Sequence, residues 1–365
     1  MTARVIMLGA GPAGLAFAYR YGTGATILEK GRVVGGLSRS IELFDGIFDV
    51  GGHSFHTPDL EVRQLVEDLM GEDWHEQPRD ARVWFRGEVI PYPFQHHYEQ
   101  LADRKLVEGF RQFNPDPACV AGSKNFDEWI QNRFGPELSR HFMLPYNRKL
   151  WAHDLKTMSC DWVGERVATE RAHTDPSTSL APERRPLQPD SRVAYPKEGG
   201  FGAIFEALAR KCSHVELGEN VVRIDLKDKI VTSQSGESWQ WDKLVSTMPL
   251  PMLLATLTTC PERLRRMAAD LRAVSLKIVM LLVRRPETDP PQRIYVADHG
   301  IPAHKIAFNH MSSPALSARS QHAIMCEVSY SETKPPLPER ELIDAMTAWL
   351  ESAGYLATRD HLIAS

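Results

Sequence analysis

The start of the chain combines two short apolar runs with a helical stretch between them. Residues 4–8 and 25–28 are short β-type runs, and residues 15–21 have the composition of a helix. A glycine-rich turn at residues 9–14 separates the first run from the helix, and Glu29 ends the second run. This order of a strand, a glycine turn, a helix, a second strand and an acidic residue predicts a Rossmann unit.

The residue types in the first turn suit a bound dinucleotide. Gly9 permits the tight turn, Gly11 lets the backbone approach a pyrophosphate, and Gly14 allows close packing of the helix on the strand. The pyrophosphate would lie at the helix N-terminus, where unpaired N–H groups and the helix dipole favour negative charge. Glu29 would accept hydrogen bonds from a ribose. The sequence therefore predicts a dinucleotide site.

Two further glycine turns follow, within residues 30–39 and 48–53. Three such turns at successive strand ends favour FAD over NAD, because the larger cofactor extends along several strand ends. Ordinary hairpin turns are the alternative interpretation. The predicted FAD contacts in these turns are Gly9, Gly11, Pro12, Ala13, Gly14, Glu29, Lys30, Gly35, Gly36, Leu37, Ser38, Gly51, Gly52 and His53.

The remaining pattern predicts helices and a second set of strands. Helical spacing marks residues 60–70, most of 97–172, 203–211 and 339–353. Residues 82–90 predict a hairpin, and strand-type runs occupy residues 215–231, 244–247, 274–283 and 323–329. Residues 174–192, rich in Pro, Ser, Asp and Arg, predict either a flap that closes over a substrate or a plain surface connection.

A chain of 365 residues suits more than one domain. We expect a discontinuous FAD-binding domain from residues 1–90, 195–272 and 338–365. Residues 91–194 are expected to form a helical insertion that contributes to the substrate site, and residues 273–337 an antiparallel-sheet domain. The predicted fold class is α/β.

The composition excludes several classes of binding partner and metal site. The net charge of −4 provides no global basic field for nucleic acid or an anionic membrane, so a phosphate-bearing ligand needs locally placed arginines and lysines. The five cysteines are scattered and form no CxxC pair, which argues against a zinc site and a disulfide framework and suits a reducing cytoplasm. No apolar run approaches the length of a transmembrane helix.

Several segments together resemble a known enzyme family. They are residues 48–53, 91–95, 126–130, 143–151, 162–167 and 244–248. In order and spacing they are similar to the UDP-galactopyranose mutases, especially the eukaryotic, fungal-type branch, within the FAD-dependent amine oxidase and protoporphyrinogen oxidase-like superfamily. The resemblance implies a Rossmann-type FAD domain, a helical insertion and a six-stranded antiparallel sheet.

The resemblance also implies a reaction. The resemblance implies that N5 of reduced FAD attacks the anomeric carbon of a UDP-pyranose and displaces UDP. The sugar–flavin adduct would open to an iminium, reclose as the furanose and be recaptured by UDP, which isomerises the UDP-sugar between its pyranose and furanose forms. There is no net redox change, and NAD(P)H would serve as the reductant.

Site residues follow from the same resemblance. Arg166 would clamp the diphosphate, because a planar guanidinium pairs with two phosphate oxygens. Gly52 and His53 would lie against the isoalloxazine. The implied substrate contacts are Tyr92, Phe94, Gln95, Met143, Asn147, Trp151, Arg166, Tyr195 and Lys305, and Val222 is an implied FAD contact. In the alternative interpretation the aromatic residues belong to the core, His53 is a turn histidine and Arg166 an exposed helix arginine.

Two features depart from the family pattern. In residues 303–314, Lys305 stands where the family has a second diphosphate arginine, and His310 or Asn309 replaces a tyrosine. Family members also continue beyond the length of this chain with further flavin and phosphate ligands. Several alternatives therefore stay open. They are a fragment of a longer protein, a homo-oligomer or a partner chain that completes the site, a flavin oxidoreductase of the amine oxidase and protoporphyrinogen oxidase type, and a truncated or non-catalytic homologue.

Overall fold

The computed structural model describes residues 4–22, 24–163, 167, 192–284, 290–357 and 362–364. It divides into two compact units. Unit 1 comprises residues 1–42, 64–74 and 196–273, and unit 2 comprises residues 43–63, 75–195 and 274–365.

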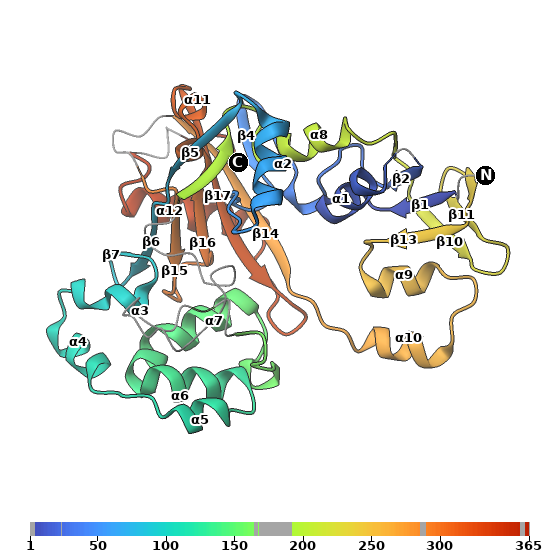
Figure 1. Cartoon of the computed structure of the whole chain (residues 1–365). Helices are drawn as coiled ribbons and strands as arrows, with labels where there is room; N and C mark the ends of the chain where they lie inside the picture. Colours follow the sequence, from blue (N-terminus) through green and yellow to red (C-terminus); the bar gives the residue numbers. More distant parts are fainter. Residues whose placement is uncertain are drawn as a thin grey trace. The chain divides into compact units, whose positions relative to one another are not determined.

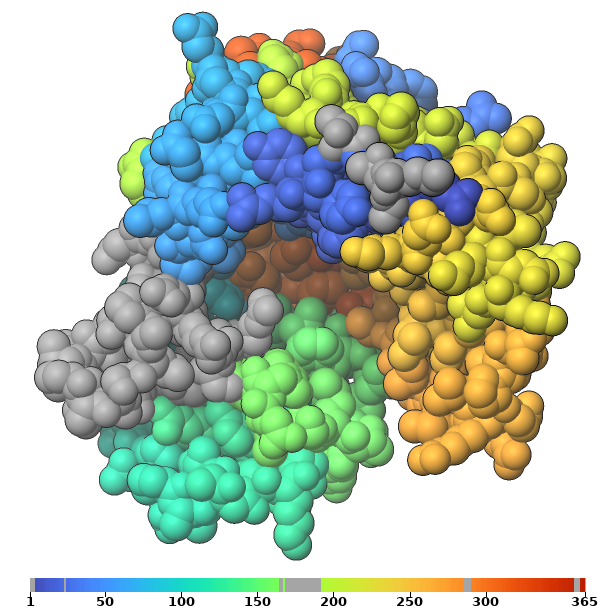
Figure 2. Space-filling view, turned by 45° about the vertical axis from the view of Figure 1, so that its right-hand side comes forward, coloured from blue at the N-terminus to red at the C-terminus, as the bar shows by residue number. Residues whose placement is uncertain are grey.

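Unit 1 is built on a parallel four-stranded sheet in the order β13-β1-β2-β9. The strands are β1 Val5–Leu8, β2 Ala25–Glu29, β9 His214–Leu217 and β13 Lys243–Ser246. Helices α1 Pro12–Tyr21 and α8 Ala203–Ala209 lie side by side (Figure 1), and the corresponding blue and yellow-green segments adjoin at the surface (Figure 2). Met7, Leu15 and Ile27 are fully buried between helix and sheet. The predicted Rossmann unit is confirmed.

The opposite face of this sheet is covered by a small antiparallel sheet in the order β10-β11-β12. Ile6 and Leu8 of β1 pack there against Ile224 and Val231. The remaining elements that lie in unit 1 are β10 Val221–Asp225, β11 Ile230–Ser233, β12 Ser238–Gln240, α9 Leu250–Thr256 and α10 Glu262–Ala269. Helix α2 Leu60–Met70 begins in unit 2 and ends in unit 1.

Unit 2 contains a seven-stranded sheet in the order β18-β14-β17-β16-β15-β6-β7. Its strands are β6 Ala81–Phe85, β7 Glu88–Pro91, β14 Ser275–Arg284, β15 Arg293–Val296, β16 Lys305–Phe308, β17 Gln321–Tyr330 and β18 Leu362–Ala364. Neighbouring strands are antiparallel except β15 and β6, which are parallel. The sheet therefore has one strand more than the resemblance implies and is mixed.

A helical layer completes unit 2. Its helices are α3 Phe94–His97, α4 Arg104–Arg111, α5 Pro117–Ala121, α6 Phe126–Leu138 and α7 Leu144–Trp151, with a π-helical turn at Ser139–Met143. Their core includes Phe94, Phe126, Ile130 and Phe142. Further elements of unit 2 are β4 Gly46–Asp49 and α11 Pro314–Ser317. Strands β3 Ser40–Leu43, β5 Trp74–Pro78 and β8 Arg192–Pro196 each include residues assigned to both units.

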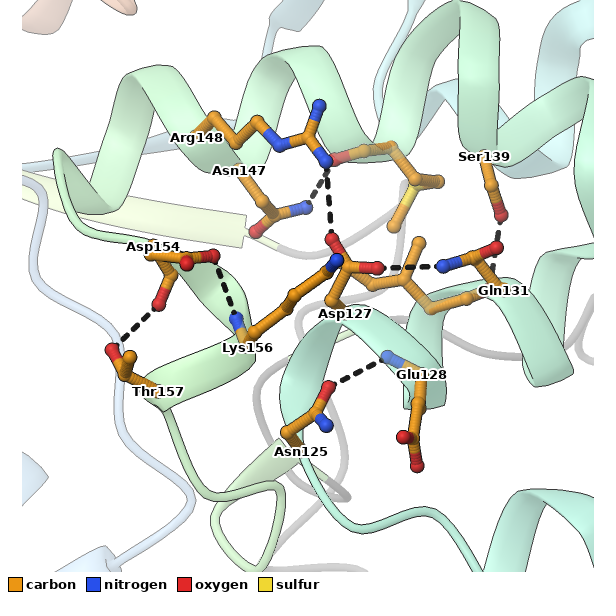
Figure 3. Close-up of polar contacts among 12 residues, drawn as sticks. Asn125, Asp127, Glu128, Gln131, Ser139, Asn147, Arg148, Asp154, Lys156 and Thr157 are labelled. Carbon is orange, nitrogen blue, oxygen red and sulfur yellow. Dashed lines mark hydrogen bonds and ion pairs between the residues drawn. The ribbon is translucent and has the colours of Figure 1, made fainter.

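Polar contacts stabilise α6, and one of them joins it to α7 (Figure 3). Asp127 is 2% exposed, and its carboxylate accepts hydrogen bonds from Gln131 Nε2 at 2.6 Å and from an Arg148 guanidinium nitrogen at 3.1 Å. The Asn125 side chain caps α6 by accepting from the Glu128 N–H. The contact between Asp127 and Arg148 ties α6 to α7, which carries residues of the site described below.

Several segments lie in a different unit from the one expected. Residues 43–63 were expected in the FAD-binding domain but belong to unit 2, and the expected helical insertion and antiparallel-sheet domain fall together in unit 2. Residues 338–365 were expected in the FAD-binding domain, but α12 Glu339–Ser352 packs in unit 2, because Leu342, Met346 and Leu350 bury their side chains against its sheet. The hairpin of β6 and β7, also expected in the FAD-binding domain, joins the same sheet. Sequence periodicity identifies such elements but does not say which sheet they cover. None of the described helices is long and apolar enough to cross a bilayer.

Candidate functional site

Unit 1 encloses a cavity of about 1150 Å³ at the carboxyl ends of β1 and β2. Nine of the predicted FAD contacts line it, namely Gly9, Gly11, Pro12, Ala13, Glu29, Lys30, Gly36, Leu37 and Val222. Other lining residues, which sequence reasoning missed, include Arg32, Arg39, Asn220, Met248, Met252 and Thr256. A cavity at the carboxyl ends of parallel strands is where dinucleotides bind in Rossmann-type folds.

The first glycine turn fits tightly around the start of α1. Gly9 has φ of +102°, in the region that favours glycine. An added Cβ at Gly14 would lie 2.0 Å from the Gly9 carbonyl oxygen, so helix and turn can approach this closely only with glycine. Gly14 does not line the cavity; it acts through packing, as the sequence predicts.

The N-terminus of α1 faces the cavity with unused backbone donors. Gly11 precedes the helix, and its first turn has no side-chain cap among the described residues. An added Cβ at Gly11 would meet nothing closer than the Gly36 Cα, at 4.0 Å. Gly35, which has φ of +96°, donates its N–H to the Ala10 carbonyl at 2.8 Å and so ties the second glycine turn to the first. The resulting backbone surface is open to an anion, and the helix dipole favours negative charge there.

Glu29 organises the same turns. Its carboxylate accepts the N–H of Ala10 at 2.8 Å with one oxygen and the N–H of Gly31 at 2.8 Å with the other. A carboxylate has about four acceptor positions, so it can also accept hydrogen bonds from a ribose. The geometry adds a structural role to the ribose-binding role that the sequence predicts.

Unit 2 contains a second cavity of about 330 Å³. Seven of the nine predicted substrate contacts line it, namely Tyr92, Phe94, Gln95, Met143, Asn147, Trp151 and Lys305. Residues that sequence reasoning did not assign also line it, among them Phe142, Tyr146, Leu150, Trp162, Tyr295, His304 and Glu327. The tertiary structure thus brings α3, α7, β15, β16 and β17 to one site.

Aromatic rings form most of the cavity wall. Tyr92 and Tyr295 have ring centroids 4.6 Å apart, and Trp151 lies edge-on to Trp162 at 5.0 Å. Burial, and after it the neighbouring Tyr295, raises the pKa of Tyr92 to about 12, so its hydroxyl stays protonated. Trp151 Nε1 is buried and has no hydrogen-bond partner among the described residues. Flat rings with polar tips suit a ligand that has both a planar group and hydroxyls.

The polar end of the cavity is a cluster of buried ionisable groups. Lys305 Nζ lies 2.7 Å from Glu327 Oε1, and His304 Nε2 lies 3.6 Å from Glu327 Oε2. Burial raises the pKa of Glu327, but the Lys305 ammonium outweighs it, so the pKa lies below its ordinary value and the group is a carboxylate. Glu327 had a sequence signal, since it is an acid inside an otherwise apolar strand-type run.

Two histidines at this end are neutral. Burial, with Lys305 as the next cause, lowers the pKa of His53 to about 4. Burial also lowers the pKa of His304 to about 4, although Glu327 acts in the opposite direction. Neutral imidazoles offer one donor and one acceptor each near neutral pH.

We expect the free energy of unfolding to fall as the pH is lowered from 6.5 to about 4. In that range the unfolded chain binds protons at His53 and His304 while the folded protein does not, so acid favours unfolding. The shifts correspond to on the order of 3 kcal/mol for each histidine. Urea midpoints measured at several pH values test this. The double variant His53→Gln/His304→Gln should lose less stability than the wild type over this range, and an equal loss would contradict the assignment.

Several predicted site residues lie elsewhere. Tyr195 is 2% exposed, and its hydroxyl donates to Asp49 at 2.8 Å in the core of unit 2, so the expectation that it lines the substrate cavity is wrong. Asn309 is buried and donates to the Ile47 carbonyl, and His310 stacks on His322 at 3.8 Å; neither lines the cavity. Arg166 and most of the predicted flap at residues 174–192 lie outside the described residues.

The remaining predicted flavin contacts are divided between the units. Ser38 ends a short 3₁₀ turn in unit 1 and does not line the cavity there. Gly51, Gly52 and His53 belong to unit 2, where Gly52 contacts Lys305 and Glu327.

A Rossmann-type unit with a glycine-lined cavity, joined to a sheet unit with an aromatic cavity, is the architecture of FAD-dependent enzymes related to the amine oxidases. The flavin containing amine oxidoreductase family matches residues 12–355, and the chain belongs to this family. FAD is the cofactor that membership implies.

Solved structures agree with this assignment. The chain is similar to a reduced UDP-galactopyranose mutase, with a TM-score of 0.84, 25% identity and coverage of 100% of this chain and 80% of that one. It is also similar to a putrescine oxidase bound to putrescine (TM-score 0.65, 16% identity, 100% and 84% covered). A CLA-producing fatty acid isomerase from P. acnes matches with a TM-score of 0.60, 17% identity and 96% and 83% covered. The last two likenesses show the fold alone.

Proposed function

We propose that this protein is a flavin-dependent mutase that isomerises a UDP-sugar between its pyranose and furanose forms. The observation that carries the proposal is the convergence of seven predicted substrate contacts on the cavity of unit 2. Similarity to a UDP-galactopyranose mutase over the whole chain supports it. The fungal-type branch and NAD(P)H as the reductant are parts of this proposal.

The residues of unit 1 fit FAD. The open backbone at Gly11 and the unused N–H groups of α1 suit a pyrophosphate, and Glu29 suits a ribose. When bound and reduced, the flavin supplies the nucleophile for exchange at the anomeric carbon. The protein supplies binding, orientation and exclusion of water.

The residues of unit 2 suit the nucleotide sugar. Tyr92 and Trp151 offer faces for a planar uracil or the apolar side of a sugar. Asn147 Nδ2 donates to the Met143 carbonyl at 2.8 Å (Figure 3), which directs its Oδ1 to accept from another donor. Arg166 carries the diphosphate in this proposal on the strength of the resemblance.

An oxidase that acts on an amine is the second candidate. Membership of the amine oxidoreductase family and the fold shared with a putrescine oxidase favour it. The buried carboxylate of Glu327 and the aromatic wall are features that would also suit a cationic amine. Its pairing with Lys305 at 2.7 Å weighs against this candidate, because the carboxylate is already neutralised.

Flavin analysis followed by two assays separates these functions. We expect near-stoichiometric FAD by absorbance, and conversion of UDP-galactofuranose to UDP-galactopyranose that requires dithionite to reduce the flavin but consumes no reductant per turnover. Oxygen consumption with putrescine and no isomerisation would favour the oxidase. A protein that binds no FAD when excess FAD is added would contradict both.

Trp151→Phe should weaken UDP-galactose binding. The substitution keeps an aromatic wall but removes Nε1, which has no partner among the described residues and is available to a ligand. Loss of one hydrogen bond of about 1 kcal/mol raises the Kd about fivefold. The matched control is Trp241→Phe in unit 1, since its Nε1 likewise has no described partner but Trp241 lines neither cavity. Equal Kd values for both variants, measured by calorimetry, would remove Trp151 from the site.

A further inference from the structure

Lys305 and Glu327 hold the backbone of Gly52 from both sides. Glu327 Oε1 accepts the Gly52 N–H at 2.6 Å, and Lys305 Nζ donates to the Gly52 carbonyl at 3.2 Å. The two side chains join each other at 2.7 Å, which closes a ring through the backbone of one residue. The side chain of Glu327 is 6% exposed and that of Lys305 is 17% exposed.

Ser54, two residues after Gly52, is also anchored. Arg293 of β15 donates to the Ser54 hydroxyl. His53 therefore lies between two residues whose positions are set by side chains of the sheet, on strands β15, β16 and β17. Gly51, on the other side, has φ of +92°, a backbone conformation that glycine adopts without strain.

We propose that Lys305 is a positioning residue that acts with Glu327 to hold the Gly52–His53 turn, and that it does not bind the phosphate of the substrate. The second half of this inference rests on the proposed function, whereas the first half does not. It assigns Lys305 a role different from that of the arginine which stands at this place in the resembling family.

Charge and donor geometry support the inference. The Lys305 ammonium already has a carboxylate and a carbonyl as acceptors, so a phosphate would have to compete with a buried ion pair. Lysine also lacks the planar fork with which arginine pairs with two phosphate oxygens. Since His53 and His304 are neutral, the described polar end of the cavity carries no net charge from this cluster.

The test compares Lys305→Met and Glu327→Gln in the FAD-loaded protein. Two quantities are measured: amide hydrogen exchange at Gly52 by NMR, and the Kd of UDP by calorimetry. The matched control is Lys277→Met, because Lys277 forms an exposed pair with Glu339 at 3.6 Å in the same unit.

We expect Gly52 to exchange at least about tenfold faster in both variants and at the wild-type rate in the control. The Kd of UDP should stay within about twofold of the wild-type value in Lys305→Met. Unchanged Gly52 exchange would overturn the positioning role. A rise of the UDP Kd by about tenfold or more, the cost of losing a charged hydrogen bond, would show that Lys305 binds phosphate.

Two further outcomes of the experiment would also decide part of the inference. If Lys305→Met does not fold, the wild type decides: the NMR signal of the Lys305 ammonium should not move when UDP saturates the protein, and a shift would contradict the inference. If the wild type binds no UDP and isomerises no UDP-sugar, the proposed function fails, while exchange at Gly52 still tests the positioning role.

Discussion

Replacing Gly14 by alanine is expected to abolish FAD retention by the purified protein. The added Cβ would lie 2.0 Å from the Gly9 carbonyl oxygen and 3.0 Å from the Met7 methyl group. The first contact is with backbone, so α1 must move away from β1 and the N–H groups at its N-terminus must move with it. Overpacking of this kind costs about 3 kcal/mol or more. A cost of this size corresponds to an increase of about 100-fold in the Kd of FAD.

Absorbance of the flavin in the purified variant measures this effect, and circular dichroism monitors folding. Gly109→Ala is the matched control, because Gly109 lies within helix α4 and its added Cβ would find the Glu137 Cγ at an ordinary 3.5 Å. That control should gain about 1 kcal/mol of stability from helix propensity and keep its FAD. A Gly14→Ala protein that retains stoichiometric FAD would show that the turn is not the cofactor site.

Replacing Gly52 by alanine is expected to lower the proposed isomerisation activity about 100-fold. The added Cβ would lie 2.6 Å from the Cβ of Ala307 on β16, so the turn that carries His53 must shift. Displacement of a catalytic group by about 1 Å can cost roughly this factor. The variant should keep most of its FAD, because the turns proposed to hold the pyrophosphate and ribose lie in unit 1.

A second substitution makes this prediction specific. In the double variant Gly52→Ala/Ala307→Gly the opposing methyl group is removed, so the turn can return and most of the activity should be restored. Ala307→Gly alone serves as the control for the cavity it creates. A double variant that is as slow as Gly52→Ala would show that the loss has a cause other than contact with Ala307.

Much of the cofactor unit follows from local patterns. Residues 4–8, 25–28 and 244–247 were predicted as strands and form neighbouring strands of one parallel sheet. The roles of Gly9 and Gly14 follow from backbone conformation and from contact between residues close in the chain. Such short-range constraints can be inferred from the residue types alone.

Unit 2 shows what local sequence patterns do not predict. Tyr195 was expected in the cavity, yet its hydroxyl donates to Asp49 in the core. No spacing along the chain indicates this contact. The ion pair of Lys305 and Glu327 and its hold on Gly52 join three segments separated by up to 275 positions. Strand register, with Lys305 directly opposite Glu327 on neighbouring strands, creates this contact.

By itself, the sequence determined the Rossmann unit, its glycine turns and the type of cofactor, because these depend on backbone freedom and on periodicity within about thirty residues. Resemblance in several motifs pointed further to seven of the residues that line the second cavity. Only the tertiary structure decided that α12 and the hairpin of β6 and β7 belong to the sheet of unit 2 and that Lys305 is paired within the protein. Such pairings depend on which distant strands become neighbours, and burial then decides which charges must find partners.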